Sequence, residues 1–162
     1  MGHLSTRLAT MDDYDAICRL LAQGDRLHAD ILPDVFQAFP GLARPRDVVA
    51  EYVEGKDKDY FLADLDGEVV GCMNIARQVA PGYPMYRRRE YAVIENVVVD
   101  ERHRRQGVGT TLLEEAKRWA RDRGLTTIQL GVWAANGPAV AFYAKHGFRV
   151  LTQKMELRLD QG

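Results

Sequence analysis

The most informative stretch of this 162-residue chain reads Val97-Val98-Val99-Asp100-Glu101-Arg102-His103-Arg104-Arg105-Gln106-Gly107-Val108-Gly109-Thr110. An apolar strand ends at Val99, a short basic turn follows, and two glycines open an amphipathic helix. The first backbone N–H groups of a helix have no intrahelical partner and carry the positive end of the helix dipole. Because glycine lets the backbone approach a ligand closely and arginine adds charge, we predict an anion cradle here.

Two common phosphate motifs are excluded by the residues present. A Walker loop requires a lysine directly before Thr110, where Gly109 stands, and the dinucleotide fingerprint requires a third glycine at Leu112. The plainer alternative to an anion cradle is a glycine turn that starts a helix, with its arginines exposed to solvent. The segment alone leaves both interpretations open.

The apolar periodicity on both sides of this segment predicts the order β-α-α-β-β-β-α-β-α-β. The Asp66-Gly67 pair favours a tight hairpin turn between two of the strands. The expected strands cover Leu4–Leu8, Tyr60–Leu65, Val69–Ile75, Tyr91–Val99, Leu125–Val132 and Phe148–Leu159, and the last helix covers Asn136–His146. We therefore expect an α/β (α+β) fold with a mixed sheet and helices on both of its faces.

Composition limits the classes of protein to consider. At about 150 residues per domain, residues 1–162 predict a single domain. The 22 Lys and Arg nearly balance 23 Asp and Glu, and a pI near 6.4 argues against a nucleic-acid-binding protein. Two cysteines form neither a disulfide framework nor a zinc motif, and no stretch of 18 apolar residues occurs. We expect a cytoplasmic protein without metal or membrane partner.

Two segments resemble the GNAT superfamily of acetyl-coenzyme A N-acetyltransferases. Arg104–Gly109 is similar to the family's Gln/Arg-x-x-Gly-x-Gly/Ala segment, and Asn136–Phe148 to its Asn-x-x-Ala-x-x-Phe-Tyr-x-x-x-Gly-Phe segment. Together they cover about the second half of the chain. The resemblance implies the GNAT fold, with a mixed, mostly antiparallel central sheet of about six to seven strands, and a homodimer.

The resemblance also implies acetyl-CoA as cofactor and assigns residues to it. Val97, Val98 and Val99 would face the pantetheine arm, Asn136 would hydrogen-bond it, and Phe142 would pack against it. The pyrophosphate would lie on backbone N–H groups of Arg104, Arg105, Gln106, Gly107, Val108, Gly109 and Thr110. The hydroxyl of Tyr143 would give a proton to the departing thiolate, although Phe142-Tyr143 is also compatible with an ordinary core pair.

Glu95 is the candidate general base. Together with Asn96 it interrupts the apolar run Tyr91–Val99, and a carboxylate in a central strand is costly unless it is paired or used. Partial burial would raise its pKa toward that of a base. The segment Ile94–Val97 also resembles the Ile-Glu-Asp-Ile segment of glucosamine-6-phosphate N-acetyltransferases, where the acidic pair lies in the active site. The alternative is a salt bridge from Glu95 to Arg88 or Arg89.

Three further features have weaker assignments. A bulge near Asn96 would free the Val97 N–H to hold an oxyanion. His28 and Arg88 are candidate acceptor-binding residues, with exposed surface positions as the alternative. The Arg87–Arg89 cluster is typical of a charged, soluble hairpin edge, and recognition of an anionic acceptor or of RNA is the alternative.

These observations predict an N-acetyltransferase that moves an acetyl group from acetyl-CoA to a primary amine of a small molecule or peptide. Both substrates would bind together, and the amine would attack directly. A catalytically idle acyl-CoA-binding module is the alternative from another class. Within the enzyme class, a protein N-terminus, a lysine or an amino-sugar phosphate are alternative acceptors.

Overall fold

A computed structural model describes residues 2–41 and 44–160 of the chain. Its contacts divide the chain into two compact units, Met1–Gly131 and Val132–Gly162. The expectation of a single domain stays a prediction. No helix in the described part of the chain is long and apolar enough to cross a membrane.

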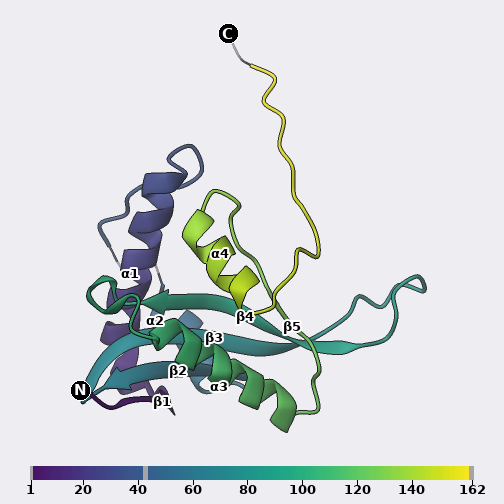
Figure 1. The fold of residues 1–162 in the computed structure, drawn as a ribbon. Coiled ribbons are helices and arrows are strands. Elements are labelled where there is room, and N and C mark those ends of the chain that lie inside the picture. The colour runs from purple at the N-terminus through teal and green to yellow at the C-terminus, as the bar shows by residue number, and fades with distance from the viewer. Residues whose placement is uncertain (1, 42–43, 161–162) are drawn as a thin grey trace. The chain divides into compact units, whose positions relative to one another are not determined.

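The first unit is built on one five-stranded sheet in the order β1-β2-β3-β4-β5 (Figure 1). Its strands are β1 (Leu4–Leu8), β2 (Lys58–Leu65), β3 (Glu68–Val79), β4 (Glu90–Val99) and β5 (Ile128–Leu130). Strands β1 to β4 pair antiparallel, and β5 joins β4 in parallel. The mixed, mostly antiparallel sheet is confirmed, but the prediction of six to seven strands is wrong.

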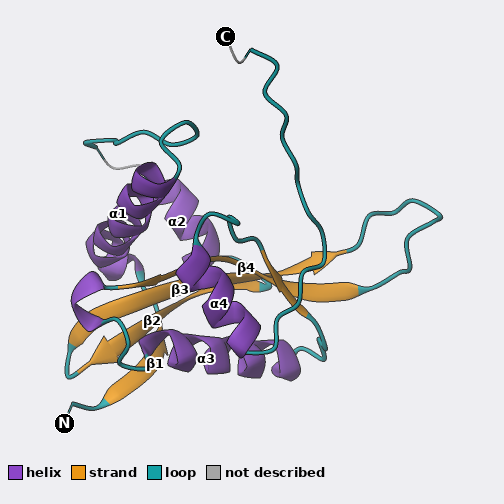
Figure 2. Cartoon of the chain, turned by 45° about the horizontal axis from the view of Figure 1, so that its top comes forward, coloured by secondary structure: helices purple, strands orange, loops and turns teal. Residues whose placement is uncertain are grey.

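Three α-helices cover the two faces of this sheet. They are α1 (Tyr14–Ile31), α2 (Arg46–Val53) and α3 (Val108–Asp122). Cys72 packs in a core cluster with residues of α1 and α2, whereas a Cβ on the preceding Gly71 would lie 2.8 Å from Val108 of α3. Because neighbouring strand residues point to opposite faces, α3 lies on the other side of the sheet from α1 and α2 (Figure 2).

The turn between β2 and β3 forms as its sequence predicts. Asp66 and Gly67 both have positive φ, 52° and 89°, which is the combination that a tight two-residue hairpin requires. Helix α1 buries Tyr14, Ile17, Leu20 and Leu21 and continues to Ile31, well beyond these buried apolar residues.

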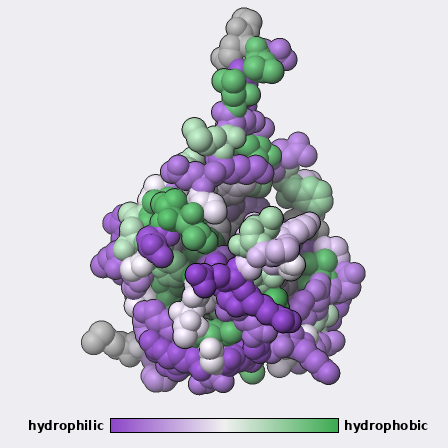
Figure 3. Space-filling view, turned by 90° about the vertical axis from the view of Figure 1, so that its right-hand side faces the viewer, coloured by the Kyte–Doolittle hydropathy of each residue, from purple (hydrophilic) through white to green (hydrophobic). Residues whose placement is uncertain are grey.

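The connection between β3 and β4, residues 80–89, extends from the sheet. In Figure 3 the side of the molecule from which this connection extends faces the viewer, and hydrophilic and apolar side chains lie next to one another on it. Tyr83, Met85 and Tyr86 are exposed, and so is the Arg87–Arg89 cluster. Arg89 stacks over the ring of Tyr91 at 5.0 Å, so part of this cluster packs on the start of β4.

The second unit contains helix α4 (Gly137–Lys145). The helix begins where its sequence predicts, because the side chain of Asn136 accepts a hydrogen bond from the Ala139 N–H and Pro138 lies in the first turn. After α4 the structure contains no strand in the described residues 148–160, so the predicted strand Phe148–Leu159 is wrong. The alternation of Met155, Leu157 and Leu159 suits a strand, but these side chains are exposed and no partner strand pairs with them.

Candidate active site

Glu95 is the extra residue of a β-bulge in β4. Asn74 of β3 pairs with Asn96 and Ile75 pairs with Ile94, so Glu95 has no partner residue on β3. A bulge re-aims side chains and interrupts the ladder, and bulges are frequent next to active sites. The structure therefore contains the bulge expected near Asn96, and the role of the Val97 N–H stays a prediction.

Strand β4 has an unpaired edge just beyond this bulge. β5 pairs with Ala92–Ile94 alone, so in the described structure residues 96–99 pair with β3 on one side and with no strand on the other. Val97, Val98 and Val99 are half-buried there. Their backbone groups on that side face away from β3 and suit an extended ligand such as a pantetheine arm.

A cavity of about 180 Å³ lies beside the bulge. Its polar lining residues are Arg44, Tyr52, Tyr60, Asn74, Glu95 and Asn96, and Leu21, Val48 and Val49 supply apolar surface. Burial raises the pKa of Tyr52, and the negative charge of Glu95 raises this pKa further. Tyr52 and the Glu95 carboxylate therefore line one cavity and influence each other electrostatically.

Glu95 is exposed, so the expected partial burial is wrong. The bulge explains this, because the extra residue of a strand projects away from the packed ladder. No ion pair in the described structure joins Glu95 to Arg88 or Arg89. Arg88 is exposed in the 80–89 connection, and Arg89 stacks on Tyr91.

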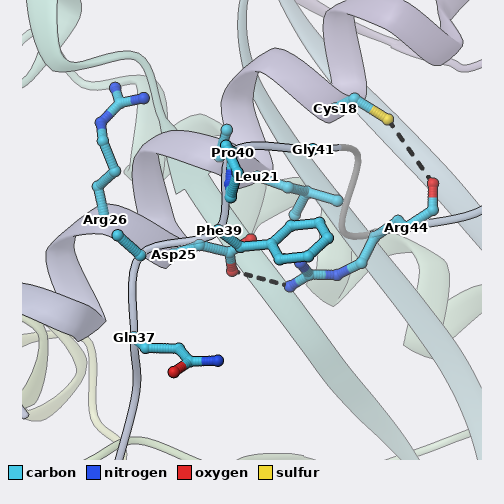
Figure 4. A pocket seen from close by; sticks show the side chains of 11 residues that line it. Cys18, Leu21, Asp25, Arg26, Gln37, Phe39, Pro40, Gly41 and Arg44 are labelled. Carbon is cyan, nitrogen blue, oxygen red and sulfur yellow. Dashed lines mark hydrogen bonds and ion pairs between the residues drawn. The ribbon is translucent and has the colours of Figure 1, made fainter. Parts of the chain in front are cut away.

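A second cavity, of about 250 Å³, shares Arg44 and Leu21 with the first. Figure 4 shows the Arg44 side chain reaching Asp25 of α1, with the ring of Phe39 beside the pair. The guanidinium donates to both oxygens of Asp25, at 2.6 and 3.0 Å. Arg44 is thereby neutralised where the two cavities adjoin.

The turn before α3 has the backbone that an anion cradle requires. Arg105 and Gly107 adopt φ of 62° and 83°, and the first intrahelical bond runs from the Thr111 N–H to the Gly107 carbonyl. Residues 104–107 are exposed, and Val108 is buried and points to Gly71. The exposed backbone of this turn fits a pyrophosphate.

Arg102 has a different role from the one its place in the basic turn indicates. Its guanidinium contacts the carboxylates of Asp100 and Glu68, and its backbone N–H donates to Asp100 at 3.0 Å. Arg102 thus tethers the turn to the end of β4. Arg104 and Arg105 are exposed and form no ion pair among the described residues, so they remain the charged side chains of the predicted cradle.

One described group of residues has side-chain geometry compatible with a metal ion. Ligand atoms of Glu68, Asp100 and His103 lie within 4.8 Å of one another. Arg19 and Arg102 contact both oxygens of Asp100, so two positive charges already occupy this position. The group is therefore a network of ion pairs.

The second unit carries the remaining predicted cofactor residues. Tyr143 packs edge to face against Phe142 and Phe148, at 5.4 and 5.6 Å between ring centroids. Burial raises the pKa of Tyr143, which keeps its hydroxyl protonated at neutral pH. Asn136 uses its side-chain oxygen to cap α4 and retains its amide donor. The roles of these residues toward a cofactor stay predictions.

His28 lines neither cavity. His28 lies in the last turn of α1, and its ring stacks on Phe36 at 5.3 Å. The fold brings four further polar residues to Glu95 that the sequence did not single out: Arg44, Tyr52, Tyr60 and Asn74. Asn74 did carry a signal, since it is the polar residue in the apolar run Val69–Ile75, and β3 places it opposite Asn96.

Comparisons with known proteins agree with this architecture. A solved structure of the BH1408 protein from Bacillus halodurans has a TM-score of 0.90, is 26% identical, and covers 96% of this chain and 99% of that one. The aminoglycoside N-acetyltransferase AAC(6')-Iy, solved in complex with CoA, has a TM-score of 0.69 at 16% identity over 99% of this chain and 97% of its own. At that identity the likeness concerns the fold alone.

Sequence relatives carry acetyltransferase names. Streptothricin acetyltransferase A of Bacillus subtilis is 33% identical to this chain over 63% of the chain's length. The matched part spans about half of that relative, 54% of its length. The L-amino acid N-acetyltransferase AaaT of Escherichia coli is 28% identical over 93% of this chain and 85% of its own. The model of the Acetyltransferase (GNAT) family matches residues 25–148. The chain therefore belongs to the GNAT acetyltransferase family, as the two sequence motifs indicate.

Proposed function

We propose that this protein is an N-acetyltransferase that moves the acetyl group of acetyl-CoA to a primary amine of a small molecule or peptide. The observation that carries the proposal is the position of Glu95. In a chain of this family, the extra residue of the β4 bulge is a carboxylate that lines a cavity and forms no ion pair among the described residues.

The residues present fit a coenzyme A ligand. The Arg104–Thr110 turn offers exposed backbone at the start of α3, and β4 has an unpaired edge at Val97–Val99. These segments would hold the pyrophosphate and the pantetheine arm. Asn136 would contribute its amide donor, because its oxygen already caps α4, and Phe142 would supply apolar contact.

Acetyl-CoA supplies an activated acyl group when bound, and the chain's own residues manage protons and charge. The Glu95 carboxylate would take a proton from the acceptor ammonium, directly or through a water, so that the nitrogen becomes nucleophilic. The Val97 N–H would donate to the oxygen that gains negative charge. The Tyr143 hydroxyl would give its proton to the departing thiolate.

The acceptor is proposed to be small because the cavity beside Glu95 holds only about 180 Å³. The named acceptors of the relatives, streptothricin and L-amino acids, are both amines. A homodimer stays a prediction.

The test is release of free thiol from acetyl-CoA in the presence of a panel of amines, measured for the wild type, Tyr143→Phe and Glu95→Gln. We expect each substitution to lower turnover by about 10²- to 10⁴-fold, the usual contribution of a positioned acid or base. Glu54→Gln, an exposed carboxylate just after α2, is the matched control and should retain turnover. Tight acetyl-CoA binding with no thiol release for any amine would instead support an idle acyl-CoA-binding module.

A further inference from the structure

Asn74 is a polar side chain buried in the middle of the central strand β3. Only 4% of its surface is exposed, and the flanking Met73 and Ile75 have no exposed surface. Burying an amide costs free energy unless its polar atoms are hydrogen-bonded, so an asparagine at this position needs a partner. The partner lies on the neighbouring strand, where the side-chain amide of Asn96 donates to Oδ1 of Asn74 at 3.0 Å.

The two asparagines form a cross-strand pair directly beside the β4 bulge. Asn74 pairs with Asn96, the next pair joins Ile75 to Ile94, and Glu95 is left between them. A slip of β4 by one residue would place Glu95 opposite Asn74 and separate the two amides. An ionised carboxylate has no proton to donate to Oδ1, so the amide pair favours the register in which Glu95 is the extra residue.

The bulge decides which face of the sheet carries the Glu95 side chain. Consecutive strand residues normally point to opposite faces, but Glu95 and Asn96 both line the cavity beside α2. If the ladder continued regularly from the Asn74–Asn96 pair, Glu95 would lie opposite Ile75 and share its face. Ile75 follows Gly71 by four residues and lies on the face that α3 covers, so Glu95 would then point away from the cavity.

The Asn74 side chain also acts on α2. Burial raises the pKa of Tyr52, the charge of Glu95 adds to this effect, and hydrogen bonding by Asn74 acts in the opposite direction. Asn74 thus interacts with Tyr52 on one side and with Asn96 on the other. Because its amide is engaged on two sides, Asn74 influences the site through its neighbours.

We propose that Asn74 is a positioning residue for acetyl transfer: its bond to Asn96 sets the β4 bulge, and the bulge turns Glu95 into the cavity. Loss of the pair lets β4 pair regularly with β3, which withdraws the carboxylate from the acceptor amine. This inference rests on the proposed function, because it explains how the base of that reaction is held.

The first measurement reports the strand register without any substrate. NMR contacts between protons of β3 and β4 identify the facing residues, and the wild type should show the contacts 74–96 and 75–94. Asn74→Leu keeps a side chain of similar size but cannot accept from Asn96, so contacts between residues 75 and 95 should appear. Asn96→Leu removes the donor at a half-buried position, should give the same change, and carries the test if Asn74→Leu does not fold.

The second measurement is the thiol-release assay, with kcat and KM determined separately. In Asn74→Leu, kcat should fall by about 10- to 100-fold, because a displaced base loses its reacting geometry. KM for acetyl-CoA should stay within about twofold, since the Arg104–Thr110 turn and the pairing of Val97–Val99 with β3 are retained.

Two further variants serve as controls. Gln78→Leu makes the same amide-to-leucine change at an exposed position of β3, opposite Tyr91 and away from the bulge, and should keep both register and kcat. Asn74→Asp keeps an oxygen that accepts from Asn96, so it should keep the register and recover about tenfold of the lost kcat. Its kcat is compared at its own pH optimum, because the new carboxylate changes the charge beside Glu95.

Three results would overturn the inference: the same register in Asn74→Leu and the wild type, an altered register with unchanged kcat, or an Asn74→Asp variant that behaves like Asn74→Leu. The register contacts also separate this inference from the proposed function. A changed register in Asn74→Leu, when the wild type releases no thiol, contradicts the acetyltransferase proposal alone. Thiol release that Asn74→Leu leaves unchanged contradicts the role of Asn74 alone.

Discussion

Asp100 shows how a single residue can hold the turn before α3 to the sheet. Of the charged side chains that the structure describes, Asp100 alone is buried, with none of its surface exposed. It accepts from Arg19 at 2.7 Å and from the backbone and side chain of Arg102. Burial acts to raise the pKa of Asp100, but these donors outweigh it and hold the pKa well below its usual range.

This network predicts an acid-dependent loss of stability. Because the folded-state pKa of Asp100 is lowered, its contribution is present above the unfolded pKa of about 4 and is lost as the pH falls through the folded pKa. We expect Asp100→Asn to lower the free energy of unfolding by about 1–3 kcal/mol at neutral pH. The difference from the wild type should shrink below about pH 4.

Denaturant unfolding across a pH series measures this difference. Asp122→Asn is the control, because Asp122 is exposed at the end of α3, and its effect should stay within about 0.5 kcal/mol. A difference between the wild type and Asp100→Asn that does not change with pH would contradict the assignment.

At the scale of elements, the sheet and α3 together position the cradle. Gly71 lets α3 approach β3 closely, since a side chain there would collide with Val108 and Leu112. Gly107 then turns the chain into the helix with a φ of 83°. The position of the turn therefore depends on two glycines: Gly71, which allows β3 and α3 to pack closely, and Gly107, which adopts a positive φ before α3.

Gly107→Ala tests whether the positive φ of Gly107 is needed for the turn. Space is open around a Cβ at this position, so the cost is backbone strain, about 1–2 kcal/mol for a non-glycine residue in the left-handed region. The turn relieves this strain by shifting its backbone away from the ligand, and we therefore expect the Kd for CoA to rise about tenfold. Calorimetric titration with CoA measures it.

Gly82→Ala provides the comparison for this variant, because Gly82 has open space and no positive φ. Its affinity for CoA should match that of the wild type. Equal affinities in Gly107→Ala and the wild type would show that the turn does not hold the ligand.

At the scale of the whole molecule, protection of the backbone should differ sharply between its parts. Cys72, Met73 and Ile75 of the central strand β3 have no exposed surface, and β3 pairs on both sides. Residues 149–158 are exposed and belong to no described helix or strand. Amide exchange depends on local opening, which is rare in core strands and frequent in exposed segments.

We therefore expect hydrogen exchange measured by NMR to differ clearly between these two parts. The amides of residues 72–75 should exchange slowest, and those of residues 149–158 should exchange within the fastest group. Protection of 149–158 comparable to that of β4 would contradict the structure and restore the strand expected from the sequence.

Local signals accounted for the elements that were predicted well. Asp66-Gly67 specifies a tight turn by its backbone preferences, and Asn136 with Pro138 specifies the start of α4 by capping. The Gly107–Gly109 turn and the polar Glu95 in an apolar strand could be recognised from the sequence for the same reason. Each of these features depends on residues adjacent in the chain.

Features that depend on residues distant in the chain could not be recognised from the sequence. Alternation at 155–159 suited a strand, yet a strand requires a neighbour to pair with, and none lies there in the described structure. Glu95 could be singled out by its type, but its exposure follows from the bulge register against Asn74. Tyr60 resembles any strand tyrosine until the fold buries its hydroxyl.

The amino-acid sequence by itself determined the family, the order of most elements and the glycine turn at the start of α3, because these reside in short motifs and periodicities. The tertiary structure determined which side chains surround Glu95, that Arg44 is neutralised by Asp25, and that Tyr60 is buried. Those properties arise from contacts between α1, β2, β3 and β4, whose residues lie far apart in the chain and become neighbours only through sheet pairing and helix packing.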